Sequence, residues 1–314
     1  MSRPSTPAPD HAHAKSGALA AALCYLLWGA FPLYWKQLIA VNSFELVAHR
    51  YVWTLVVLMV VIAAQAVFAR RSFSASGFSD VRAALGTPRG FAINALSATL
   101  LTANWLVYVW GVNTGHVIET SLGYFLVPLV NVAAGRFVLH EHLRRLQWGA
   151  IACAAGGVAL MIFQLGRPPW IALSLAGTWG GYSLMRKQSS LGALTGLTVE
   201  TLLIVPFALG VLLWRQHVGA GALGHADVKT HALLLCSGIV TAIPLLLFAY
   251  AARRIRLSTL GLLQYLAPSV QLGIGVAIYH ENFSHERALS FAFIWIGLAL
   301  YTADNLWAQR NAAR

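Results

Sequence analysis

Charge is scarce in this chain of 314 residues. Only 10% of the residues are Asp, Glu, Lys or Arg and 58% are hydrophobic, whereas a soluble domain carries about 25% charge. This shortage excludes a water-soluble fold. Cysteine is scarce too, because Cys24, Cys153 and Cys236 are the only three. All three fall inside long apolar stretches, so no disulfide framework is predicted.

Catalytic and cofactor signatures are also missing. The chain has no glycine-rich phosphate loop, which argues against ATP as the energy source, and no cofactor is expected. His140-Glu141-His142 lacks the spacing of a zinc-protease helix, so no metal site is predicted. The four aspartates form no pair within an apolar run. An intramembrane enzyme is therefore only a remote alternative.

Long apolar runs take up most of the sequence instead. They are close to 20 residues long, which is the length needed to cross a hydrocarbon core of about 30 Å. We therefore expect an all-α polytopic membrane protein with ten transmembrane helices, whose surroundings are the lipid bilayer. The expected spans cover residues 17–39, 44–68, 90–112, 117–140, 146–164, 169–186, 194–214, 230–252, 257–279 and 288–307.

Lys and Arg are distributed unevenly between the expected loops. With a cytoplasmic N-terminus, 15 of them fall in internal loops and tails and 5 in external loops, while Arg50 and Arg136 lie within spans. The positive-inside rule then places both termini in the cytoplasm. The net charge of +12 follows from this topology, so no nucleic-acid partner is expected. Residues 1–15 are polar and rich in Pro, Ala and His, which is typical of a disordered tail, and no cleavable signal is expected.

The same helix pattern occurs twice. The matching positions, at offsets of 140 and 151 residues, are Pro128 and Pro268, Gly135 and Gly275, His140-Glu141 and His280-Glu281, Trp28-Gly29 and Trp179-Gly180, and Lys36 and Lys187. Because five spans per repeat is an odd number, the second half must enter the membrane in the opposite orientation. We predict two inverted five-helix repeats, over residues 16–164 and 168–309, with a substrate site between them.

Four strings carry a family resemblance: LLWGAFPLYWK from Leu26, ANWLVYVWGVNTGHVIETSLGYFLVPLVNV from Ala103, GLTVETLLIVPFAL from Gly196 and STLGLLQYLAPSVQ from Ser258. They resemble the RarD family of chloramphenicol-sensitive proteins, in the EamA-type branch of the drug/metabolite transporter superfamily. The resemblance extends from about Lys15 to Trp307. It implies ten helices in two inverted repeats, location in the bacterial inner membrane and export of small molecules.

Polar and aromatic residues within the spans are candidates for a substrate cavity. Asn104 and Tyr108 share one helix face, and the pairs Tyr124–Asn131 and Gln264–Gln271 occupy matching repeat positions. Aromatic walls would bind flat or cationic solutes. The alternatives are hydrogen bonds between helices and an interfacial aromatic belt. The predicted cavity residues are Trp28, Asn104, Tyr108, Tyr124, Asn131, Trp179, Gln264, Tyr265 and Gln271, with helix kinks at Pro128 and Pro268 that free backbone carbonyls.

Ionisable residues within spans are costly and are functional candidates by default. Glu45, His49 and Arg50 lie near the start of the second span, while Glu119 and Glu200 lie in the fourth and seventh. They are predicted to act in gating or proton coupling. The alternatives are an ion cluster that anchors a helix end and hydrogen-bonded structural carboxyls.

The preferred function is a secondary transporter that exports small organic metabolites or drugs by alternating access. In one version of this mechanism, export is coupled to proton movement. An uptake permease or a uniporter for the same solutes is the main alternative, and a membrane scaffold is more remote. Gly149, Cys153 and Gly157 form a small-residue face. This face is predicted to pack within the chain or, as the alternative, to form a homodimer contact.

Overall fold

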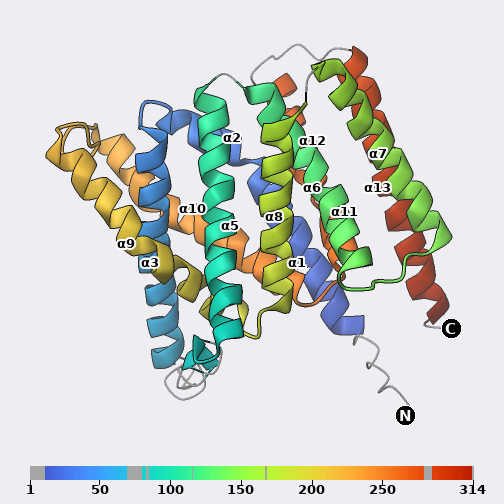
Figure 1. Cartoon of the computed structure of the whole chain (residues 1–314), viewed down its shortest axis with the longest axis horizontal. Helices are drawn as coiled ribbons and strands as arrows, with labels where there is room; N and C mark the ends of the chain where they lie inside the picture. The colour runs from blue at the N-terminus through green and yellow to red at the C-terminus, as the bar shows by residue number, and fades with distance from the viewer. Residues whose placement is uncertain are drawn as a thin grey trace.

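The computed structural model describes residues 11–68, 80–82, 85–114, 116–166, 168–278 and 285–312, and this part of the chain contains helices but no strands (Figure 1). The first half contains α1 (His11–Gly29), α2 (Phe31–Trp35), the 3-10 helix η1 (Lys36–Leu38), α3 (Ser43–Phe68), α5 (Pro88–Asn113), α6 (Val117–Phe137) and α7 (Arg145–Leu165). The second half contains α8 (Trp170–Gln188), α9 (Ala193–His217), α10 (Val228–Ala252), α11 (Leu257–Leu263), α12 (Leu266–Ala277) and α13 (His285–Ala312). The expected all-α fold is therefore confirmed for the described residues.

Several of these helices can span a bilayer. Seven segments are long and apolar enough by length and composition: Ala14–Leu38, Ser43–Gln65, Pro88–Gly111, Arg145–Phe163, Ala193–His217, Val228–Ala252 and Leu257–Ala277. A shorter apolar stretch, Ala288–Asp304, lies in α13. α1 begins at His11, within the predicted tail. His280 and Glu281, from the second copy of the repeat motif, lie outside the described residues.

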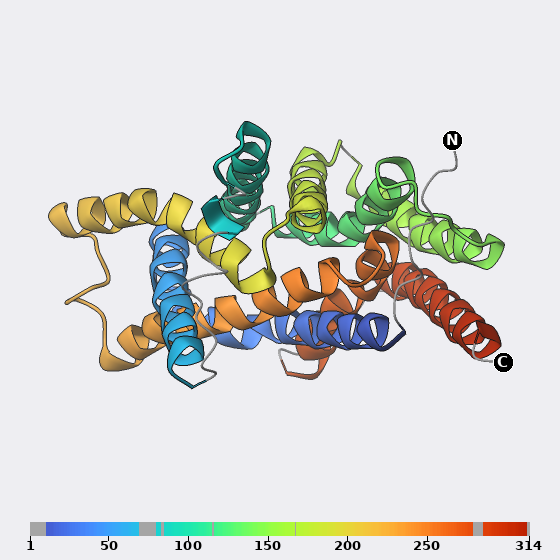
Figure 2. The ribbon, with the colours of Figure 1, turned by 90° about the horizontal axis from the view of Figure 1, so that it is seen from below.

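The helices form two layers, which Figure 2 shows edge-on. Neighbours in one layer follow the order α9, α5, α8, α6 and α7, and neighbours in the other follow the order α3, α10, α1, α11–α12 and α13. Between the layers, α3 packs on α9, α6 on α11, and α7 on α13. Each layer thus contains helices from both halves, so neither half forms a separate body.

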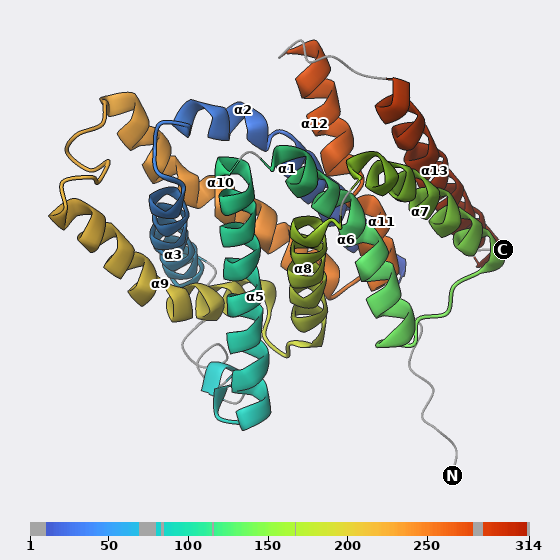
Figure 3. The same cartoon turned by 45° about the horizontal axis from the view of Figure 1, so that its top comes forward.

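Prolines interrupt two of the expected spans. α1 ends at Gly29 before Pro32, and α11 and α12 are separated at Gln264–Tyr265, just before Pro268. A proline cannot donate to the carbonyl four residues earlier, which for Pro268 is that of Gln264. Pro128, by contrast, lies inside the continuous helix α6. The short α2 continues along the edge of the bundle, where it contacts α12 (Figure 3).

The small-residue face on α7 allows close packing against α13. A Cβ atom added to Gly157 would lie 2.6 Å from the carbonyl oxygen of Ser290, and one added to Gly297 would lie 2.6 Å from the carbonyl oxygen of Ala150. Gly149 has open space around it. At Gly157, this face therefore packs within the chain.

Candidate functional site

A cavity of about 210 Å³ lies between the two layers. It is lined by residues of α1, α2, α3, α5, α6, α8, α10 and α12 and by the segment that joins α11 to α12. Towards the edge that carries α2, its lining residues Phe31, Trp35 and Tyr108 are partly or fully exposed. Deeper in the bundle, Asn104 and Gln264 are buried. The cavity therefore opens towards the α2 edge and ends inside the bundle.

The structure brings seven of the nine predicted cavity residues to this space: Trp28, Asn104, Tyr108, Tyr124, Trp179, Gln264 and Gln271. The other two do not line it. Asn131 is buried and donates from Nδ2 to Oε1 of Gln264 at 3.3 Å. Tyr265 is buried as well, and its hydroxyl donates to the carbonyl of Phe125 at 3.2 Å.

Seven further residues of the cavity wall are absent from the predicted site residues: Phe31, Pro32, Trp35, Trp105, Thr241, Leu245 and Ala267. Trp105 follows Asn104 directly, but adjacent residues on a helix normally face different directions. Thr241 is one of four hydroxyl residues in the apolar helix α10, with Thr230, Ser237 and Tyr250. Residue type does not distinguish it from the other three, so the sequence contains no signal for the α10 wall.

Arg50 is the only Lys, Arg, Asp or Glu among the lining residues. Its Nε donates to the hydroxyl of Thr241 at 3.1 Å. The guanidinium carbon lies 3.8 Å from the ring centroid of Trp105 and 4.8 Å from that of Trp35. These cation–π contacts hold the guanidinium in the cavity wall. Arg50 was predicted to take part in gating, and the structure places it in the cavity itself.

Aromatic rings close the inner end of the cavity. The ring of Trp28 lies 5.0 Å from that of Trp179, which is 5.4 Å from Tyr182, and Tyr182 stacks on Phe248 at 5.7 Å. Tyr182 and Phe248 are fully buried. The hydroxyl of Tyr25, also buried, donates to the carbonyl of Leu260 at 3.1 Å. This aromatic floor separates the cavity from the edge where α1 begins.

Polar contacts tie the helix ends together beyond this floor. The Glu141 carboxylate accepts hydrogen bonds from the backbone N–H groups of Leu257 and Ser258, at 2.7 and 3.1 Å, and from the Ser258 hydroxyl. A carboxylate at a helix N-terminus is favoured by the helix dipole. The ammonium group of Lys187 donates to the carbonyls of Ala252 and Ile255. The segment between α6 and α7 is thus joined to the start of α11, and the end of α8 to the end of α10.

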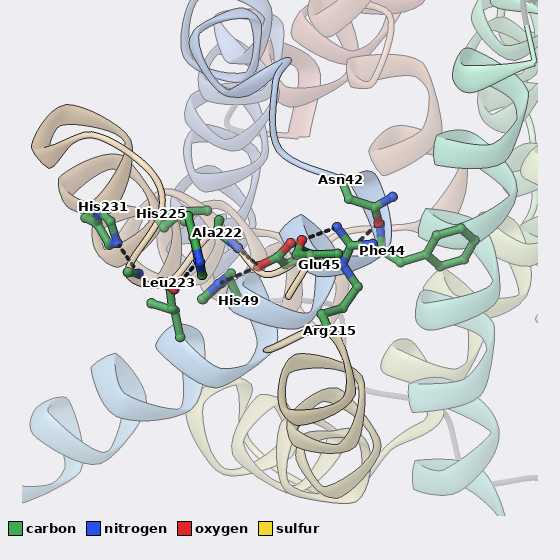
Figure 4. A network of polar contacts seen from close by, with 12 residues as sticks. Asn42, Phe44, Glu45, His49, Arg215, Ala222, Leu223, His225 and His231 are labelled. Atoms are coloured by element: carbon green, nitrogen blue, oxygen red, sulfur yellow. Dashed lines mark hydrogen bonds and ion pairs between the residues drawn. The ribbon is translucent and has the colours of Figure 1, made fainter. Parts of the chain in front are cut away.

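Glu45 and His49 lie apart from the cavity, in the network drawn in Figure 4. The Glu45 carboxylate accepts hydrogen bonds from the Ala222 backbone N–H and from Nε of Arg215, the latter at 3.4 Å. His49 Nε2 lies 3.9 Å from the same carboxylate. Arg215 and Ala222 belong to α9 and to the α9–α10 loop. Glu45 therefore fastens this loop to the start of α3.

Glu200 belongs to a second buried network, on α9. Its Oε1 accepts a hydrogen bond from the Ser97 hydroxyl at 2.5 Å and an ion-paired one from Nη1 of Arg186 at 3.2 Å. Arg186 and Glu200 are both almost fully buried. Arg186 is one of the 15 basic residues expected in the internal loops and tails, whereas the structure places it inside the bundle. This pair joins α8, α9 and α5 without lining the cavity.

Glu119 lies at the start of α6 and also does not line the cavity. Its Oε1 accepts a hydrogen bond from the backbone N–H of Ile171, in the first turn of α8, at 2.9 Å. An acceptor at this position satisfies an N–H group that has no partner within its own helix. This geometry corresponds to the structural alternative for Glu119.

No group of three or more His, Cys, Asp or Glu side chains that could hold a metal ion is found among the described residues. What the cavity offers is a cation, aromatic faces, amides and hydroxyls. These groups suit reversible binding of a small organic molecule.

Comparison with known proteins identifies one transporter family over almost the whole chain. Residues 15–163 and 169–303 each match the EamA-like transporter family. An uncharacterized transporter of Vibrio cholerae serotype O1 is 40% identical over 98% of both chains. Protein RarD of Streptomyces exfoliatus is 40% identical over 96% of this chain and 92% of its own. Protein RarD of Escherichia coli K12 is 35% identical over 97% of this chain and 100% of its own.

The fold is also shared with a protein of known crystal structure. That chain is 22% identical and superposes with a TM-score of 0.68, over 92% of this chain and 98% of its own. The chain therefore belongs to the EamA-like transporter family, as a multi-pass membrane protein similar to the RarD proteins.

Proposed function

We propose that this protein is a secondary transporter that exports a small organic solute across the bacterial inner membrane by alternating access. The observation that carries the proposal is the cavity between the layers, which is lined by both halves and closed at one end by the aromatic floor. Sites deep in the membrane at the interface of two repeats are typical of secondary transporters. In this form of the protein, the substrate enters or leaves at the α2 edge.

The proposal includes two inverted five-helix repeats. Gly29 packs against Val270, and its counterpart Gly180 packs against Val130, the counterpart of Val270. Exchange of the two halves also maps the order of one layer onto the order of the other. Matched contacts of this kind support a pseudo-two-fold axis in the membrane plane, which allows the halves to exchange conformations.

The positive-inside distribution supports cytoplasmic termini and, with them, an external α2 edge. In the proton-coupled version of the mechanism, Glu119 or Glu200 takes up and releases a proton during the cycle. Glu→Gln substitutions at both positions test this version, because they keep size but abolish titration. Export at an unchanged rate and with an unchanged pH dependence would reduce the proposal to a uniporter.

Transport by the purified full-length protein in liposomes tests the function directly. Vesicles loaded with a metabolite extract are expected to lose specific solutes only when the protein is present. Ala267→Trp places an indole in the cavity wall and is expected to block this loss. Ala63→Trp, at an exposed position of α3, is the matched control and should not. Normal efflux through Ala267→Trp would show that the cavity is not the route, and uptake without efflux would identify a permease.

A further inference from the structure

The cavity contains one positively charged side chain, Arg50, and no acidic side chain of the described residues neutralises it. The ion pairs of the described residues join Glu45 to Arg215, Glu200 to Arg186 and Asp304 to Arg144. The carboxylates of Glu119, Glu141 and Asp227 accept hydrogen bonds from backbone N–H groups. Arg50 takes part in none of these contacts.

Two aromatic rings and one hydroxyl hold the guanidinium of Arg50. Its central carbon lies over the rings of Trp105 and Trp35, while only Nε has a hydrogen-bond acceptor, Thr241, among the described residues. A guanidinium has five N–H donors in one plane. The ring contacts use none of these donors, so the N–H groups of Nη1 and Nη2 have no acceptor among the described residues. Two parallel N–H groups of a guanidinium match the two oxygens of a carboxylate.

An unneutralised cation within a membrane protein is costly, and a bound anion offsets that cost. From these observations we propose that the cavity binds small organic carboxylates, with Arg50 as the residue that pairs with the carboxylate group. The aromatic walls at Trp28, Trp179 and Tyr124 contact the apolar part of the solute. The same charge repels cationic solutes, so the cavity discriminates by sign as well as by shape. This assignment of the substrate class rests on the proposed transport function.

Three aromatic probes of similar size test the sign of the preferred charge: benzoate, neutral benzamide and benzylammonium. Binding to the purified full-length protein is followed by quenching of tryptophan fluorescence, with calorimetry as a check. We expect benzoate to bind at least tenfold more tightly than either of the other two probes. Equal binding of the three probes, or tighter binding of benzylammonium, overturns the proposal whatever happens to the variants.

Substitution then tests the role of Arg50. Arg50→Gln is expected to lower benzoate affinity at least tenfold and to leave benzamide affinity unchanged. Arg50→Lys keeps the charge but loses the planar fork of donors. Its affinity for benzoate should therefore lie between those of the wild type and Arg50→Gln. Arg254→Gln is the matched control, because Arg254 also stacks on an aromatic ring, that of Tyr250 at 3.4 Å, but lies outside the cavity. A loss of affinity in this control equal to that in Arg50→Gln contradicts the proposal. If Arg50→Gln does not fold, the probe series on the wild type and Arg50→Lys decide.

Two further measurements separate the possible failures. If chloride at equal concentration abolishes benzoate binding, the site is one for inorganic anions and the carboxylate assignment is overturned. Counterflow of labelled benzoate in liposomes tests transport independently of binding. Binding that depends on Arg50 without counterflow supports the site and contradicts the transport function. Counterflow of benzamide at the same rate as benzoate supports transport and contradicts the carboxylate site.

Discussion

The side-chain amide of Gln271 donates a hydrogen bond to the main-chain carbonyl of Trp28 over 3.3 Å. This carbonyl is available because Pro32, four residues further on, has no N–H to offer it. The contact joins α12 of the second half to α1 of the first half at the cavity wall. Asn131 occupies the matching repeat position but donates to Gln264 instead. The two halves therefore differ here, as a cavity that is open at only one end requires.

Gln271→Leu should destabilise the protein by about 1–3 kcal/mol, because the carbonyl of Trp28 loses its partner in a partly buried wall. The measurement is the unfolding temperature of the purified protein in detergent. Gln65→Leu, at an exposed position of α3, serves as the control and should show no such loss. Equal unfolding temperatures for Gln271→Leu and the wild type would mean that the contact contributes little.

Neighbouring positions at the α11–α12 break should differ in reactivity. Gln264 lines the cavity, whereas Tyr265 is fully buried beside Phe125. In a background without the three native cysteines, Gln264→Cys is expected to react with a small water-soluble thiol reagent. Tyr265→Cys is expected to react much more slowly. Rates are read by mass spectrometry, and similar rates at the two positions would contradict the observed arrangement of the cavity wall.

The apolar runs were sufficient to predict the all-α fold, and the polar and aromatic residues within them predicted part of the cavity wall. They did not predict which prolines break a helix, since Pro128 lies in continuous α6 and Pro268 follows a gap. The prediction placed both Gln264 and Tyr265 on the cavity, although adjacent residues of a helix normally face different directions. Only Gln264 lines the cavity, and a periodic pattern contains no information about where a helix breaks.

The partners of the acidic residues were also missed by the sequence prediction. Glu45 and Glu119 contact backbone N–H groups of Ala222 and Ile171, more than 50 residues away. A backbone group has no signature in the sequence, so such partners cannot be identified from residue types. Their spacing indicated that these carboxyls need partners, but only the packing of the helices shows which groups they are.

The carboxyl of Asp227, at the start of α10, should make the stability of the protein depend on pH. Its carboxylate caps the helix by accepting from the Thr230 N–H at 3.0 Å. Hydrogen bonds from the side chain and the backbone of Thr230 hold the pKa of this carboxyl below its ordinary value of 3.8. A pKa that is lower in the folded state gives a stabilisation that is complete above the unfolded pKa and is lost as the pH falls through the folded pKa. Asn at this position still caps but does not titrate. We therefore expect the unfolding temperature of the wild type to fall relative to that of Asp227→Asn below about pH 4, and parallel curves would contradict this.

The buried pair of Arg186 and Glu200 yields a prediction about stability. Glu200→Gln removes the only carboxylate within ion-pair distance of a fully buried guanidinium in the described chain. Breaking one partner of such a pair costs about 3–5 kcal/mol, because the remaining charge has no compensation. Glu200→Gln should therefore unfold at a much lower temperature than the wild type.

The double variant Arg186→Met/Glu200→Gln separates the loss of the ion pair from the free-energy cost of leaving one buried charge without a partner. It should recover much of the lost stability, since the replacement of both charges leaves no uncompensated ion. Ser97→Ala removes a hydroxyl hydrogen bond to Glu200 and leaves both charges in place, so it should cost less, about 1.5–3 kcal/mol. Denaturant titrations of the wild type, Arg186→Met, Glu200→Gln and the double variant in detergent give the coupling free energy. A double variant as unstable as the sum of its single variants would mean that the two residues act independently, and a Glu200→Gln protein of normal stability would mean that the pair contributes little to stability.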